Sequence, residues 1–284
     1  MIRNLYLSGV PYAARVGGRP IGMFDSGFGG LTVARAVMDL LPNEDLIYLG
    51  DTGRYPYGSK PLEVVQQYSL EIAEHLVAEY DVKFLIVACN TATAAALDVL
   101  ASTYDIPVIG VIEPGVRAVV ERTDSRRIGV IGTVGTVSSG AYEQALAALQ
   151  TEVSMTTCAC PGLVEFVERG ETTGPQVEIL AERLLQPIVD ADVDALLLGC
   201  THYPYLARAI RKVVGPDVVL VSSADETAFA AAAQLAELGL LAPERSGNAT
   251  FISSGDVAAF TRLGSRLLGP ELADAHSWRP QHAP

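Results

Sequence analysis

The chain has 284 residues, of which 49% are hydrophobic and 19% are charged, and its formal net charge is −13. This length suits two domains, and the composition allows a large buried core and excludes a disordered chain. The negative charge argues against nucleic acid as the main partner, and no apolar run approaches the roughly 18 residues of a membrane span.

Residues 1–20 lack the continuous apolar segment of a signal peptide, because glycine and proline interrupt them repeatedly. We therefore treat them as an N-terminal extension and expect a cytoplasmic protein. In that compartment the four cysteines, Cys89, Cys158, Cys160 and Cys200, should be reduced.

Strands and helices are predicted to alternate, which is typical of a parallel sheet covered on both faces. In the first half we expect strands over 19–24, 46–49, 84–88 and 108–112, and helices over 31–41, 62–80 and 92–102. In the second half we expect strands over 127–131, 153–158, 195–198 and 218–221, and helices over 138–150, 165–170, 175–188 and 204–213. A helix over 225–240, a strand over 249–253 and a helix over 257–268 follow, and the tail from residue 271 should be frayed.

Two strand–loop–helix units recur with nearly one offset, which suggests two similar halves. The segment from Ile128 aligns with the segment from Ile21, 107 residues earlier, and Cys200 aligns with Cys89, 111 residues earlier. Ligands of open α/β sheets bind at the carboxyl ends of the strands. If the halves face each other, Asp25, Cys89, Thr133 and Cys200 would therefore lie along one cleft.

Cys89 and Cys200 each end a run of apolar residues, and small polar residues follow both. Asn90 or Thr91 is a suitable N-cap for the helix after Cys89, and Pro204 suits the first position of the helix after Cys200. Because helix N-termini favour thiolates and bind carboxylates, we expect a lowered pKa for both thiols. Two thiols facing each other would supply an acid/base pair, although a single buried cysteine is more often a small hydrophobe.

His202 is the only histidine placed beside one of these thiols, where it could polarise Cys200 or act as a general acid. The glycine-rich turn over 25–30 lacks a nucleotide-binding fingerprint, and the Cys158/Cys160 and Cys200/His202 spacings are not those of a usual zinc site. None of the three lysines is placed like the cysteines, which weakens a pyridoxal mechanism. We therefore expect no metal, while a Schiff-base lysine stays open as an alternative at this point.

Five motifs, in this order, resemble those of the glutamate racemases: FDSGFGG at 24–30, GDT to YPYG at 50–58, ACNTA at 88–92, IGVIGT at 128–133 and GCTHYP at 199–204. The resemblance implies cofactor-independent interconversion of L- and D-glutamate, which supplies D-glutamate for peptidoglycan in the cell wall. It also implies an α/β fold of two pseudo-symmetric, doubly wound parallel-sheet domains with the active site in the cleft between them. The first domain would comprise residues 21–112 and 223–268 and the second residues 113–222, with an extension at 1–20 and a tail at 269–284. Members of the family are often dimers, so the resemblance allows a homodimer.

The resemblance further implies roles for individual residues. Cys89 would take the α-proton of D-glutamate and Cys200 that of L-glutamate; Asp25 would assist Cys89, His202 would assist Cys200, and Glu168 would be a further acid near the second thiol. Substrate contacts are implied for Asp25, Ser26, Tyr57, Gly58, Asn90, Thr91, Thr133, Thr136, Thr201 and His202. Residues 162–165 depart from the more apolar run expected in the family, which affects the surroundings of Glu168.

Three other functions are compatible with these residues. In an aspartate racemase of the same superfamily, a glutamate would be expected at the position of His202. A thiol hydrolase could use Cys200 with His202 as its base, but it would leave Cys89 without a role. A two-lobed binding protein for an acidic amino acid would bind its ligand tightly without turnover.

Overall fold

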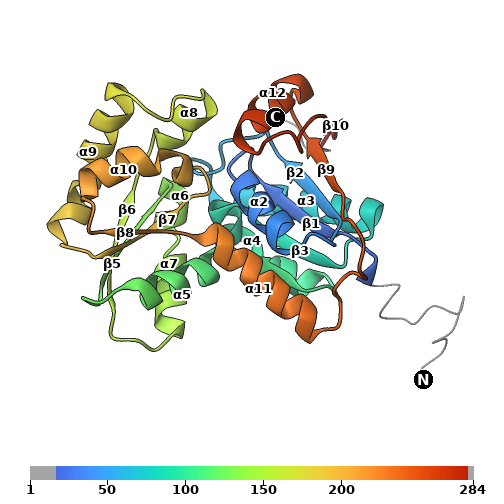
Figure 1. Ribbon diagram of the computed structural model, residues 1–284, viewed down its shortest axis with the longest axis horizontal. Helices are drawn as coiled ribbons and strands as arrows, with labels where there is room; N and C mark the ends of the chain where they lie inside the picture. The colour runs from blue at the N-terminus through green and yellow to red at the C-terminus, as the bar shows by residue number, and fades with distance from the viewer. Residues whose placement is uncertain (1–16, 281–284) are drawn as a thin grey trace, which may run out of the picture.

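The computed structural model describes residues 17–280, which form two lobes side by side, each built around its own parallel sheet (Figure 1). The predicted extension therefore lies mostly outside the described residues. The strands of the first sheet are β1 (Ile21–Asp25), β2 (Leu46–Gly50), β3 (Phe84–Val87), β4 (Val108–Gly110), β9 (Ala249–Ser253) and β10 (His276–Ser277). The strands of the second sheet are β5 (Arg127–Gly132), β6 (Ser154–Ala159), β7 (Ala195–Gly199) and β8 (Val219–Ser222).

Helices connect the strands and cover both sheets. The first lobe contains α2 (Leu31–Leu40), α3 (Leu62–Tyr80), α4 (Asn90–Thr103) and α12 (Val257–Leu267). The second contains α5 (Ile112–Arg122), α6 (Val134–Ser138), α7 (Ala141–Ala148), α8 (Leu163–Glu168), α9 (Pro175–Asp190), the 3-10 helix η1 (Tyr203–Leu206) and α10 (Ala207–Val214). Helix α11 (Ser223–Glu237) packs against both α2 and α5 and so joins the lobes along one side (Figure 1).

The strand order of the second sheet recurs within the first sheet. The first has the order β10-β9-β2-β1-β3-β4 and the second the order β6-β5-β7-β8, and every pairing is parallel. The segment β2-β1-β3-β4 therefore corresponds strand by strand to β6-β5-β7-β8. This correspondence confirms the prediction of two similar halves in a doubly wound α/β fold.

The central strands of both sheets are mostly apolar, and their apolar side chains are buried on both faces of each sheet. Along β1, Ile21 and Met23 belong to the core that includes residues of α2 and α11, whereas Phe24 belongs to the core that includes residues of α3 and α4. Successive side chains of a strand point to opposite faces, so a continuous apolar run serves two cores at once. Within residues 17–280 no helix is long and apolar enough to cross a bilayer.

The C-terminal tail is packed rather than frayed. Leu272 is completely buried, and β10 extends the first sheet by pairing with β9. The amide of Trp278 donates to the carbonyl of Ser253 at 2.9 Å. The prediction of a loose tail is therefore wrong as far as residue 280.

Candidate active site

The predicted site residues gather where the central strands of both sheets end. Asp25 ends β1, Cys89 lies two residues after β3, Thr133 follows β5 and Cys200 follows β7. In each sheet these neighbouring strands mark the point where the strand order reverses, which is the usual ligand site of an open α/β sheet. The two edges face each other, and a pocket lies between them.

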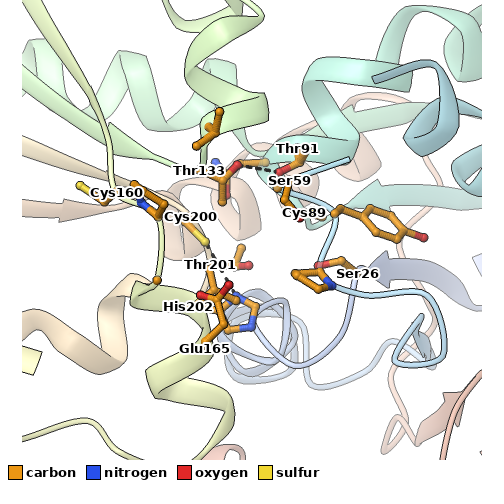
Figure 2. A pocket seen from close by; sticks show the side chains of 18 residues that line it. Ser26, Ser59, Cys89, Thr91, Thr133, Cys160, Glu165, Cys200, Thr201 and His202 are labelled. Atoms are coloured by element: carbon orange, nitrogen blue, oxygen red, sulfur yellow. Dashed lines mark hydrogen bonds between the residues drawn. The ribbon is translucent and has the colours of Figure 1, made fainter. Parts of the chain in front are cut away.

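Both lobes contribute to the lining of this pocket. The first lobe supplies Ser26, Pro56, Tyr57, Gly58, Ser59, Cys89, Asn90 and Thr91. The second supplies Thr133, Val134, Cys160, Pro161, Gly162, Val164, Glu165, Cys200, Thr201 and His202. Figure 2 shows Cys89 and Cys200 on opposite walls. Among the predicted residues, Asp25, Thr136 and Glu168 do not line the pocket but lie behind its wall.

Cys89 is the N-cap of α4, a position that the sequence assigned to Asn90 or Thr91. Its sulfur accepts a hydrogen bond from the amide of Ala92 at 3.5 Å. Burial and then the nearby Asp25 carboxylate nevertheless raise the pKa of Cys89 to about 12. The prediction of a lowered pKa is wrong for this thiol, because loss of water and a like charge outweigh the helix end.

Asp25 is fully buried and uses both of its carboxylate oxygens. Oδ1 accepts from the amide of Gly27 at 2.8 Å, and Oδ2 accepts from the hydroxyl of Thr201 in the other lobe at 3.2 Å. Asp25 therefore acts on Cys89 through its charge while it also ties the two lobes together.

Cys200, His202 and Glu168 form a line on the second wall. The Cys200 sulfur lies 3.8 Å from Nδ1 of His202, and Nε2 of His202 lies 3.1 Å from Oε1 of Glu168. Burial alone would lower the pKa of His202, but the hydrogen bonds and charges of Cys200 and Glu168 raise it well above its ordinary value of 6.5. In this line the imidazole can carry a proton beside the Cys200 sulfur.

The unusual stretch before Glu168 does not disturb this line. Helix α8 begins at Leu163, and Leu163 and Val167 are buried in the core of the second lobe. This packing directs Glu168, at the end of the helix, towards His202.

No α-helix begins directly after Cys200. The chain forms η1 from Tyr203 to Leu206, and α10 begins only at Ala207. The predicted helix over 204–213 is therefore divided into a 3-10 turn, which holds Pro204, and a shorter α-helix.

Polar contacts close the lobes against each other around the pocket. The hydroxyls of Thr91, Thr133 and Thr136 lie within 2.9–3.0 Å of one another, and the amide of Gly135 donates to the carbonyl of Gly58 at 2.8 Å. A Cβ at Gly58 would lie only 2.5 Å from Cβ of Thr133, so glycine permits this close approach.

Asn90 joins the same interface but keeps one polar atom unpaired. Its Nδ2 donates to the hydroxyl of Tyr142 at 2.8 Å. Its buried Oδ1 has no hydrogen-bond partner within the part of the chain that the structure describes. Asn90 lines the pocket, so this unpaired buried oxygen belongs to a residue of the pocket wall.

Eight lining residues were not among those predicted: Pro56, Ser59, Val134, Cys160, Pro161, Gly162, Val164 and Glu165. Ser59 directly follows the YPYG motif, so its place in the sequence could have predicted that it lines the pocket. Glu165 lies in the stretch that departs from the family pattern, and Cys160 lies just before that stretch; only the fold brings both residues to the pocket wall.

Comparison with known proteins identifies the family. Residues 32–231 match the family model described as Asp/Glu/Hydantoin racemase. The glutamate racemase of Beutenbergia cavernae is 50% identical over 270 residues, which cover 90% of this chain and 92% of that protein. The glutamate racemase of Mycobacterium tuberculosis is 48% identical over 263 residues, which cover 92% and 96% respectively.

Solved structures agree. Glutamate racemase isoform RacE1 from Bacillus anthracis has a TM-score of 0.86 and 43% identity, covering 92% of this chain and 97% of that one. The glutamate racemase of Francisella tularensis, in complex with D-glutamate, has a TM-score of 0.84 and 34% identity, covering 93% and 97%. The chain therefore belongs to the Asp/Glu/hydantoin racemase family, among the glutamate racemases.

Proposed function

We propose that the enzyme interconverts L- and D-glutamate without a cofactor, using Cys89 and Cys200 as its two acid/base groups. The observation that carries this proposal is the placement of two thiols on opposite walls of one pocket, each with its own ionisable partner. Inversion at an α-carbon requires proton removal from one face and proton delivery to the other, which a single nucleophile does not provide.

The reaction balances with these two sulfurs alone. One thiolate takes the α-proton and becomes a thiol, which leaves an α-carbanion whose charge spreads into the substrate carboxylate. The opposite thiol donates its proton to the other face of the same carbon and becomes a thiolate. An α-proton of an amino acid is very weakly acidic, so the barrier must be lowered by orientation and by a water-poor, preorganised pocket.

The ionisable partners of the two thiols differ in kind, an imidazole at Cys200 and a carboxylate at Cys89. A protonated His202 can donate to a Cys200 thiolate, and Glu168 favours that protonated form. Cys89, with its pKa raised to about 12, holds its proton at neutral pH. This combination is suited to L-glutamate, with Cys200 as the base and Cys89 as the acid, and transfer of one proton between the walls makes the enzyme ready for D-glutamate.

The pocket offers hydroxyls and backbone amides to the substrate carboxylates. Hydroxyls of Ser26, Thr91, Thr133 and Thr201 border it, and its described lining contains no lysine or arginine. The anionic groups of glutamate would therefore be held by local dipoles within a chain of net charge −13. The unpaired Oδ1 of Asn90 is a suitable acceptor for the substrate ammonium.

We further propose that the reaction supplies D-glutamate to peptidoglycan in the cytoplasm. Depletion of the protein in the organism that produces it should stop growth, and D-glutamate added to the medium should restore growth. Arrest that D-glutamate does not relieve would separate the enzyme from this role.

The activity is tested by following the optical rotation of each glutamate enantiomer with purified protein and no added cofactor. Both enantiomers should converge on the racemate, and L-aspartate should react at least about 100-fold more slowly, because the pocket would leave polar groups unpaired around a shorter side chain. Equal or faster turnover of aspartate would favour the aspartate racemase alternative.

A thiol hydrolase is the second candidate function, because Cys200, His202 and Glu168 are also arranged as a nucleophile, a base and an acid in sequence. Such an enzyme would acylate Cys200 with activated esters and would not need Cys89. Rapid ester hydrolysis that persists in Cys89→Ala, without racemisation by the native protein, would support the hydrolase instead.

A further inference from the structure

The loop between β2 and α3 forms part of the pocket wall. Pro56, Tyr57, Gly58 and Ser59 from this loop line the pocket. The loop has little regular structure of its own, so its position depends on the side chains that hold it from behind.

A buried charged cluster holds the loop. Arg54 is only 2% exposed, and its Nε donates to Oδ2 of Asp51 at 2.8 Å while Nη1 donates to Oε2 of Glu71 at 2.6 Å. The hydroxyl of Tyr57 donates to the same Asp51 oxygen, and Ser254 donates to the other one. A pocket residue and the Arg54 guanidinium therefore share one carboxylate.

Aromatic rings enclose the guanidinium, and one of them comes from the C-terminal tail. Cζ of Arg54 lies 4.1 Å from the ring centroid of Tyr68 and 5.5 Å from that of Trp278. Trp278 in turn stacks on His75 with ring centroids 5.2 Å apart. A guanidinium that is shielded from water is attracted to such ring faces, so both rings help to fix its position.

Backbone contacts of the C-terminal tail position Trp278 beside Arg54. Strand β10 pairs with β9, and the amide of Trp278 donates to the carbonyl of Ser253. Ser254, which follows Ser253 in the chain, donates a hydrogen bond from its hydroxyl to Oδ1 of Asp51. The tail, the cluster and the pocket loop are therefore connected by consecutive direct contacts.

We propose that Arg54 and Trp278 are positioning residues for the substrate, and that the C-terminal segment completes the active site from outside the pocket. Trp278 fixes the Arg54 guanidinium, Arg54 fixes Asp51, and Asp51 fixes Tyr57 and with it Gly58 and Ser59. This inference concerns glutamate binding and rests on the proposed function.

The chain contains a single tryptophan, so Trp278 reports on its own surroundings. Titration of the native enzyme with racemic glutamate, which undergoes no net turnover, should change the tryptophan emission. The change should be saturable, with half-saturation within about threefold of KM. Emission that stays constant while glutamate saturates the enzyme would overturn the proposal.

Variants supply the second arm of the test. Trp278→Ala should raise KM for both enantiomers at least fivefold and leave kcat within twofold, whereas Trp278→Phe, which keeps a ring beside Arg54, should match the native enzyme within twofold. Phe229→Ala removes an exposed aromatic ring of α11 and serves as the matched control with unchanged kinetics.

A Trp278→Ala variant with native KM would overturn the inference, even if its melting temperature fell. If that variant does not fold, the fluorescence titration of the native enzyme decides alone. Racemisation by the native enzyme in the same assay separates this inference from the proposed function, because it tests the function without any variant.

Discussion

Nε2 of His202 lies 3.1 Å from Oε1 of Glu168, and both side chains are almost completely shielded from solvent. A buried imidazole would ordinarily lose its proton. Here the carboxylate on one side and the Cys200 sulfur on the other keep the proton on the ring. The relationship gives Cys200 a partner that can carry positive charge, whereas the charged neighbour of Cys89 is the Asp25 carboxylate.

Replacement of Glu168 by glutamine should lower the pKa of His202 and slow racemisation about 10- to 100-fold, because a charge-assisted hydrogen bond is lost. The pKa can be read from the imidazole proton resonances in NMR spectra, in which only four histidines contribute. His75, whose pKa burial lowers, is an internal reference because it should titrate at the same pH in both proteins. An unchanged His202 titration would contradict the proposed effect of Glu168.

The same pair should make stability depend on pH. Because the pKa of His202 is raised in the folded state, its contribution to the free energy of unfolding is complete below the unfolded value of about 6.5 and is lost as pH rises through the folded pKa. The stability difference between the native enzyme and His202→Asn should therefore shrink above neutral pH in urea unfolding experiments. A difference that grows with pH would show that the imidazole is neutral in the fold.

Cys89 should react slowly with iodoacetamide at neutral pH and progressively faster as pH rises towards 10. Its pKa of about 12 keeps the thiolate scarce at neutral pH. As long as the pH stays well below the pKa, the thiolate fraction increases about tenfold with each unit by which the pH is raised. Asp25→Asn removes a carboxylate that raises this pKa and should accelerate the reaction at a given pH. Mass spectrometry of the Cys89 peptide measures the rate, and a slower reaction in Asp25→Asn would contradict the assigned electrostatic role.

Gly58→Ala should impair activity more than stability. The new methyl group would lie 2.5 Å from Cβ of Thr133 and would push the two lobes apart at the pocket. We expect kcat/KM to fall at least about tenfold, while the free energy of unfolding falls by about 1–3 kcal/mol, as for other overpacked sites. Native kinetics in this variant would mean that the lobes need not close at Gly58.

Much of the fold was readable from the sequence, because buried parallel strands such as β1 and β7 are continuous apolar runs between turns. Helix α5 was missed because Pro114 and Gly115 resemble a break, although proline is tolerated in a first helical turn. The division of the chain after Cys200 into η1 and α10 also lacked a clear signal, since Pro204 suits the start of either helix type.

The candidate site was predictable in its residues but not in its electrostatics. Matching motifs located Cys89, Cys200 and His202, because these motifs lie within three residues of the carboxyl ends of recognisable strands. The direction of the pKa shift of Cys89 depends on how deeply it is buried and on its distance from Asp25, a residue 64 positions earlier in the chain. The contact between Trp278 and Arg54 depends in the same way on tertiary packing, which a two-residue strand does not reveal.

The most direct test of the two-thiol mechanism is incubation of each glutamate enantiomer in D₂O with the native enzyme, Cys89→Ala and Cys200→Ala, while optical rotation and α-deuterium are followed. The native enzyme should racemise both enantiomers and incorporate deuterium, and each variant should lose racemisation by at least about 100-fold, because one face of the α-carbon then has no acid or base. Racemisation at a native rate in either variant would contradict the mechanism.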